Sequence, residues 1–271
     1  MTAGFLLFAM SNAIAQNDTL SSSTRTRDRD SRVRSSDRGA SNRVSIVAGF
    51  ADGQRRDIVV SPLTYAGSGY AASAAYDHLG ANSAVAVVAT WDAQLLRPQT
   101  GVNGATERVM QGGLRAAAMR SVRDTHAWTF SAGASGGLWG FGTEHRYPEP
   151  YASRAGFFAA FATVGPAVEL RRAIGTGAAQ LDLDAPLFGF SDRSYSETKS
   201  GQPLLDFRRV GPGELRALNG ALTYTPAPLG RVGLVFAYRF SILNYRDAQP
   251  MRAVSQSFSI GLSRYFGGPP R

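Results

Sequence analysis

Residues 257–266 read Ser-Phe-Ser-Ile-Gly-Leu-Ser-Arg-Tyr-Phe, and large apolar residues alternate in this stretch with small or polar ones. Successive side chains of an extended chain point to opposite sides, so Phe258, Ile260 and Leu262 share one face. Serine and glycine fill most of the other face. This pattern predicts a β-strand with one apolar face and one small, polar face.

The same period of two recurs upstream. In 83–97, the residues Val85, Val87, Trp91 and Leu95 fall on one side, and 231–246 repeats the pattern with larger aromatics. Clusters of Gly, Pro, Asn and Asp separate such stretches between 44 and 266, which predicts an all-β chain. The expected strands are 44–51, 58–78, 83–97, 108–122, 126–142, 152–173, 178–189, 213–226, 230–246 and 252–266.

Alternation alone also fits a soluble, secreted β-sandwich that binds ligands, whose apolar faces pack on each other. The connections favour a barrel, because short ones alternate with longer polar ones at 98–107, 143–151 and 190–212. Short turns at one rim and long loops at the other are typical of transmembrane β-barrels. We therefore expect a single antiparallel transmembrane β-barrel of about ten strands, with eight or twelve as the alternatives.

The stretch 257–266 resembles the carboxyl-terminal strand of bacterial outer-membrane β-barrel proteins, which alternates and ends in aromatic residues. The resemblance implies that Phe258, Ile260, Leu262, Tyr265 and Phe266 form the signal read by the barrel-assembly machinery, a partner during biogenesis. It extends as a pattern over 44–266 and points to a superfamily, not to one functional family. Two departures are Arg264 on the apolar face and the residues 267–271 beyond the final Phe.

The amino-terminal residues predict export. An apolar run is followed by polar residues and by Ala13-Ile14-Ala15, which is typical of a signal peptide cleaved after Ala15. Residues 17–43 carry seven arginines and four aspartates with almost nothing to bury, so we expect a disordered linker over 16–43. The expected domains are a signal peptide (1–15), this linker and an outer-membrane barrel (44–271).

Composition excludes several kinds of chemistry. The 271 residues contain no cysteine, which rules out a disulfide or a thiol nucleophile, and Lys199 is the only lysine. The three histidines are scattered without ligand spacing, so we expect no metal and no cofactor. The net charge is +9, yet aspartates interrupt the arginine-rich linker, so we expect no nucleic acid as a partner. The expected partners are outer-membrane lipid and lipopolysaccharide.

Charged residues on the polar face are expected to point into the barrel. Ten strands leave a narrow lumen, and charges confined there must pair. The predicted lumen charge network comprises Asp92, Arg115, Glu169, Arg171, Asp182, Asp184 and Arg239. The filled lumen that this network implies is favoured over a conducting, porin-like one.

Two further sites are weaker candidates. His145, beside Glu144 in the expected outer loop 143–151, is the one candidate for catalysis, as a lipid-acting hydrolase would need a histidine at the outer rim. Arg208 and Arg209 in the loop 190–212 could bind lipopolysaccharide phosphates. The sequence favours a non-enzymatic barrel with a structural, surface-interaction or small-solute passage role, with the hydrolase and the soluble sandwich as alternatives.

Overall fold

The computed structural model describes residues 41–57, 61–80, 82–100, 104–125, 128–148, 154–195, 207–246 and 250–267. The predicted signal peptide and nearly all of the predicted linker lie outside these residues. None of the described residues forms a helix that is long and apolar enough to cross a membrane.

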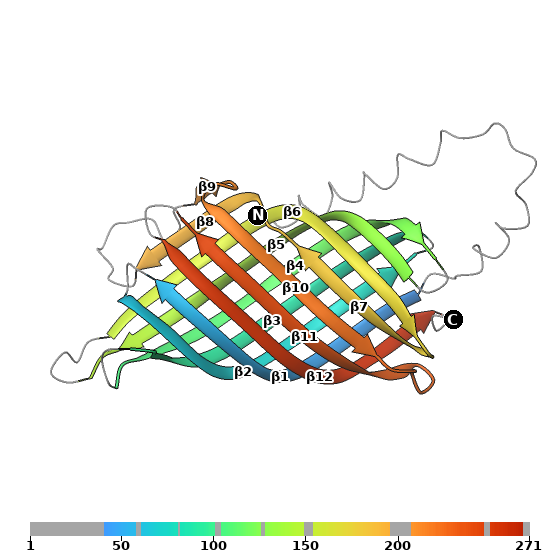
Figure 1. Ribbon diagram of the computed structural model, residues 1–271, viewed down its shortest axis with the longest axis horizontal. Coiled ribbons are helices and arrows are strands. Elements are labelled where there is room, and N and C mark those ends of the chain that lie inside the picture. Colours follow the sequence, from blue (N-terminus) through green and yellow to red (C-terminus); the bar gives the residue numbers. More distant parts are fainter. Residues whose placement is uncertain are drawn as a thin grey trace, which may run out of the picture. The chain divides into compact units, whose positions relative to one another are not determined.

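The described chain is built from strands (Figure 1). They are β1 (Ser41–Asp57), β2 (Ser61–Leu79), β3 (Ser83–Pro98), β4 (Thr106–Asp124), β5 (Trp128–Arg146), β6 (Arg154–Ile174), β7 (Gly177–Asp184), β8 (Phe188–Tyr195), β9 (Arg208–Val210), β10 (Leu215–Thr225), β11 (Val232–Tyr245) and β12 (Met251–Gly267).

The strands form one antiparallel sheet that closes on itself. β1 pairs with β12 along its whole length, from Ser41 opposite Gly267 to Asp57 opposite Met251. β7 and β8 pair with successive parts of β6, and β10 and β9 pair with β7 and β8 in turn. β7 and β8 together form one interrupted strand, and β9 and β10 together form another. The closed barrel therefore has ten strands, as predicted.

Closure removes the two-sheet arrangement of the alternative β-sandwich. The interruption between β7 and β8 falls at residues 185–187, where Pro186 has no N–H to donate. The backbone N–H groups of Ala185 and Leu187 still donate to carbonyls of β6 across the gap. One extra residue on this strand shifts the register by one position, from Ala167 opposite Asp184 to Val164 opposite Phe188.

The strands are longer than the hydropathy pattern predicts at several ends. β1 begins three residues before the expected barrel start and continues to Asp57, six residues beyond its predicted end. β5 continues to Arg146, and β8 runs through residues 188–195 that were expected partly in a loop. In each case the neighbouring strand supplies backbone hydrogen-bond partners. These hold the strand extended even where apolar and polar residues do not alternate in the sequence.

The apolar face of the sheet points outward. Ile46, Phe50, Tyr70 and Phe258 are among the most exposed large apolar side chains. The register places Tyr238, Phe258, Phe50 and Tyr70 side by side on β11, β12, β1 and β2. These four rings form one continuous aromatic row on the outward face of four neighbouring strands.

The outward apolar belt is shorter than the strands. On β11 it runs from Val232 to Ile242, eleven residues, which fits a tilted transmembrane strand of about 9–11 residues. On β4 it ends at Met110, and the next outward residue is Arg108; on β5, Glu144 and Arg146 lie outward and form an ion pair. We call this end of the barrel, which holds Asp57, Arg146 and Met251, the outer end, and the opposite end the inner end.

Short turns lie at the inner end. β6 and β7 are joined by Gly175 and Thr176 alone, and Gly175 has a φ of 58°, a left-handed conformation that favours glycine. The three longest connections, 99–105, 147–153 and 196–207, leave from the outer end, as the sequence predicts. This asymmetry matches that of outer-membrane barrels.

We predict that charge on the outward face destabilises the barrel according to depth. Ile260 lies near the middle of the belt on β12, and Val254 lies near its outer edge; both side chains are about half exposed. Ile260→Arg should cost about 2–4 kcal/mol in the free energy of unfolding, and Val254→Arg about 0–1 kcal/mol. Denaturant titration of the chain in lipid vesicles measures both values, and equal costs at the two positions would contradict an outward membrane belt.

Candidate functional site

The site that the fold builds is the interior of the barrel, where contacts join strands on opposite walls. Side chains from the outer end, the middle and the inner end meet across the lumen. Each group is described in turn, because together they decide whether anything can pass.

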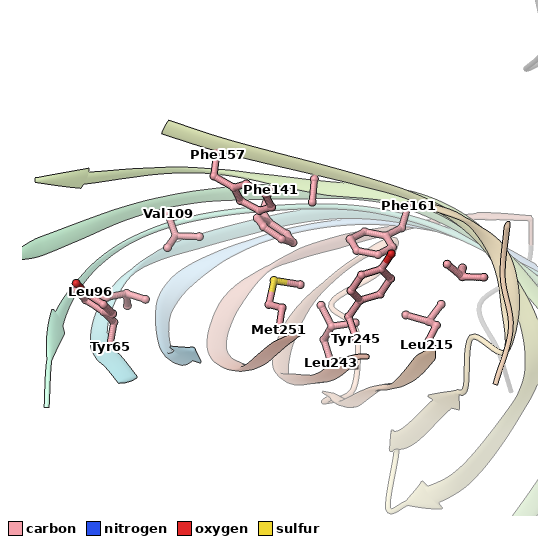
Figure 2. Packing of buried hydrophobic residues seen from close by; sticks show 12 residues of the cluster. Tyr65, Leu96, Val109, Phe141, Phe157, Phe161, Leu215, Leu243, Tyr245 and Met251 are labelled. Atoms are coloured by element: carbon pink, nitrogen blue, oxygen red, sulfur yellow. The ribbon is translucent and has the colours of Figure 1, made fainter. Parts of the chain in front are cut away.

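An apolar layer crosses the lumen near the outer end (Figure 2). The buried members come from nine strand segments and form one contiguous cluster: Tyr65, Leu96, Val109, Phe141, Phe157, Ala159, Phe161, Val210, Leu215, Leu243, Tyr245 and Met251. The rings of Phe161 on β6 and Tyr245 on β11 lie 5.7 Å apart, although two barrel strands separate β6 from β11 in the sheet. The layer therefore bridges the walls; it does not merely line one of them.

Charged or titratable side chains of β1, β4 and β5 are buried beside this apolar layer. The Arg55 guanidinium lies 3.8 Å from the centre of the Phe141 ring and 3.5 Å from the Glu107 carboxylate. It also lies 3.8 Å from Asp57, and His145 Nε2 lies 3.5 Å from Glu107 Oε1. All four charged or titratable groups are buried.

This group lies beyond the apolar belt, because Glu107 and His145 alternate with the outward-facing Arg108, Glu144 and Arg146. Burial raises the pKa of Glu107 to about 7, with Arg55 opposing the shift. Burial, together with Arg55, lowers the pKa of His145 to about 4. The same desolvation thus favours the neutral form of both side chains.

The middle of the lumen is polar and contains a cavity of about 210 Å³. Asp92 accepts hydrogen bonds from Gln94 at 3.0 Å and Gln111 at 2.5 Å. Both amides also reach Ser255 on β12 across the barrel. The cavity is therefore crossed by hydrogen bonds at its outer side.

Arg115 on β4 and Asp184 on β7 both line this cavity and form an ion pair across the lumen. Arg239 lines the same cavity, and among the described residues its Nε has no hydrogen-bond partner. The middle of the lumen thus holds the ion pair of Arg115 with Asp184, and the Arg239 guanidinium, which lines the cavity.

A network of hydrogen bonds and ion pairs centred on Gln180 crosses the lumen at the inner end. Arg43 on β1 pairs with Asp77 at 2.8 Å and reaches Gln180 and Thr225 across the lumen. Gln180 also accepts a hydrogen bond from Arg171 and donates to Glu169 and Asp182.

The predicted lumen charges are all on the lumen side, and the structure brings most of them together. Glu169, Arg171 and Asp182 meet at Gln180, and Arg115 meets Asp184. Asp92 is held by amides instead and forms no ion pair with any described cation. The sequence analysis missed Arg43, Asp77, Arg55, Asp57 and Glu107. Asp77 could have been found from its odd position on β2, in phase with the inward Tyr65; the others lie at strand ends that were not predicted to be strand.

His145 was expected in an exposed loop next to Glu144, and this placement is wrong. It lies in β5 with 2% of its surface exposed, and the carboxylate near it belongs to Glu107, its cross-strand partner. Neither ring nitrogen has a hydrogen-bond partner among the described residues, so no described hydroxyl is held by this histidine as a nucleophile.

Arg208 and Arg209 were also expected in a loop, and they lie in β9 instead, paired with Ser191 and Phe190 of β8. Both are exposed. The described part of the chain contains no group of three or more His, Asp or Glu side chains that could hold a metal ion.

No protein-family model and no curated protein matches this sequence. Solved structures of similar fold include the outer membrane protease OmpT from Escherichia coli, with a TM-score of 0.58 at 7% identity, covering 85% of this chain and 98% of that one. The translocator domain of the autotransporter NalP from Neisseria meningitidis gives a TM-score of 0.46 at 10% identity, covering 97% and 94%. The chain has the fold of bacterial outer-membrane β-barrels.

The Glu107–His145 pair predicts an unusual pH dependence of stability. On folding, Glu107 gains affinity for a proton, because its pKa rises from 4.5 to about 7, and His145 loses affinity, because its pKa falls from 6.5 to about 4. The two effects cancel between pH 4.5 and 6.5, so this pair should leave the free energy of unfolding flat there.

Single substitutions should separate the two opposite dependences of the free energy of unfolding on pH. In Glu107→Gln only His145 remains, and stability should rise with pH between about 4 and 6.5 because the unfolded chain binds more protons. In His145→Asn only Glu107 remains, and stability should fall as pH rises from 4.5 to about 7. Each slope is at most about 1.4 kcal/mol per pH unit. Denaturant titration across this window decides, and slopes of the same sign in both variants would refute the assignment.

Proposed function

We propose that this chain is an integral protein of the bacterial outer membrane whose barrel is closed to solutes. Its role is structural or in surface interaction, carried by the outer end. The barrel itself serves as a rigid membrane anchor for that end.

Membrane insertion is supported by the outward face. Phe50, Ile260 and Leu262 are each at least half exposed, and no second sheet covers them among the described residues. The likeness to OmpT supports the fold, and the activity in that protein's name is not carried over at 7% identity. An exported barrel also fits the predicted signal peptide, and β12 would present the assembly signal to the barrel-assembly machinery.

The single observation that carries the closed state is the apolar layer across the outer end. Phe161 on β6 and Tyr245 on β11 meet there across two intervening strands, and Arg55 over Phe141 joins β1 to β5. The Gln180 network forms a second barrier at the inner end. Two barriers in series favour an anchor over small-solute passage.

The hydrolase alternative gains little from this geometry. A general base must lie within hydrogen-bond reach of its nucleophile, directly or through one water. His145 is instead enclosed by Glu107, Arg55 and the ring of Tyr65, which lies 5.4 Å away edge-on. These contacts support a structural role for the histidine.

Planar-bilayer recording tests the closed lumen. The full chain should insert and show no unitary conductance steps, while a general porin in the same bilayer serves as the positive control. The double variant Arg239→Gln/Asp182→Asn should stay closed as well, because the apolar layer above these residues is intact.

Insertion must be shown in the same preparation. Migration in gels that changes on heating, together with resistance to carbonate extraction, identifies an inserted barrel. Unitary conductance from the inserted wild type would overturn the closed lumen, and a chain that stays soluble without detergent would overturn membrane insertion.

A further inference from the structure

Three arginines and one asparagine form a row across four strands on the outward face. The register places Arg56 of β1 opposite Arg252 of β12, Arg252 opposite Asn244 of β11, and Asn244 opposite Arg216 of β10. Neighbouring strands lie about 4.8 Å apart, so the row spans roughly 15 Å. We call these four residues the arginine row.

The pair of Arg56 and Arg252, at one end of this row, is unfavourable by itself. Directly opposite residues have Cβ atoms about 4.5–5.5 Å apart, and like charges at that separation repel. Arg56, Arg216 and Arg252 are exposed, and no ion pair joins them to a carboxylate within the described ranges. The row therefore concentrates positive charge that this part of the chain does not neutralise.

The arginine row borders the apolar belt. Val254, Ile242 and Leu218 lie one outward position closer to the inner end on the same three strands, and all three are more than a third exposed. Two residues along a tilted strand correspond to a rise of about 5 Å. On β10, β11 and β12 an apolar side chain thus follows the row directly, whereas on β1 the polar Gln54 and Asp52 lie between Arg56 and Phe50.

We propose that the arginine row binds the phosphate groups of a phosphorylated lipid in the outer leaflet. The proposal rests on the membrane placement proposed above, with the outer end facing outward. Each guanidinium offers a planar fork of N–H donors that fits two phosphate oxygens, and a shared phosphate would turn the repulsion between Arg56 and Arg252 into two attractions. The Asn244 amide would add a donor between Arg252 and Arg216.

A lipid explains this position better than free phosphate does. Free phosphate would need the guanidinium groups alone, and any exposed arginine pair would serve. A lipid also needs an apolar wall below its headgroup, and Val254, Ile242 and Leu218 supply one on the same strands. These residues differ from Arg208 and Arg209, which the sequence analysis selected for phosphate binding.

The test uses the full chain in detergent and the double variant Arg56→Gln/Arg252→Gln, with bisphosphorylated lipid A as the probe. Native mass spectrometry over a lipid titration should show saturable binding by the wild type and about tenfold or greater loss of affinity in the variant. The matched control is Arg97→Gln/Arg120→Gln. It removes the same charge from outward-facing arginines that lie at opposite ends of β3 and β4 and cannot share a phosphate, and its affinity should stay within about twofold of the wild type.

Two further probes separate the sources of phosphate. Dephosphorylated lipid A should bind weakly, with the same affinity for the wild type and for the variant. Inorganic phosphate should show no saturable binding at lipid-equivalent concentrations. Equal lipid A binding by all three proteins, or tight binding of the dephosphorylated lipid, would overturn the proposal. Inorganic phosphate binding as tightly as lipid A would overturn the lipid assignment.

Failure of this proposal can be told from failure of the proposed function. Vesicle insertion and heat-modifiable migration are measured on the same three proteins. A wild type that inserts but does not distinguish the variant from the control refutes the arginine row alone. A wild type that does not insert refutes the membrane placement.

Discussion

The structure depends on one constraint, the pairing of every backbone N–H and C=O group where no water can reach. In hydrocarbon an unpaired edge costs several kcal/mol per group, so a sheet is stable there only when it closes. The pairing of β1 with β12 and of β5 with β6 completes that closure. Closure then assigns the two faces, because every second side chain must point to the outside and the others into a lumen of fixed width.

A narrow lumen makes its charges interdependent. Water in such a space is scarce, so a buried ion is stable only with a partner or several hydrogen bonds. The inner end meets this demand with Gln180, whose amide serves both carboxylates and guanidinium groups. The outer end meets it differently, with Arg55 held against Glu107, Asp57 and the Phe141 ring, and with the shifted pKa values of Glu107 and His145 keeping those groups neutral over much of the acidic range.

The sequence predicts strands and their inward face well where hydropathy alternates. It predicts them poorly where only the pairing with a neighbouring strand determines which residues are in the strand. The belt strands, their number and the lumen side of Asp92, Arg115 and Asp184 follow from a period of two. The outer ends of β1 and β5 do not, because Asp52, Gln54 and Arg56 are polar on the face that is apolar further down. Nor could Glu107 be assigned to His145, since 38 positions separate them and only the pairing of β4 with β5 brings them together.

Arg55 and Arg56 show how much the register adds to composition. They are neighbours in sequence with identical chemistry, yet the pleat sends one into the lumen and the other outside. Arg55 is 4% exposed and contacts carboxylates, a sulfur atom and an aromatic ring, so its charge is satisfied inside the barrel. Arg56 faces Arg252, so its charge is left for a partner outside the described chain. The outer end of this barrel therefore has two electrostatic surfaces, an inner one that is satisfied internally and an outer one that is complete only when an anion lies on it.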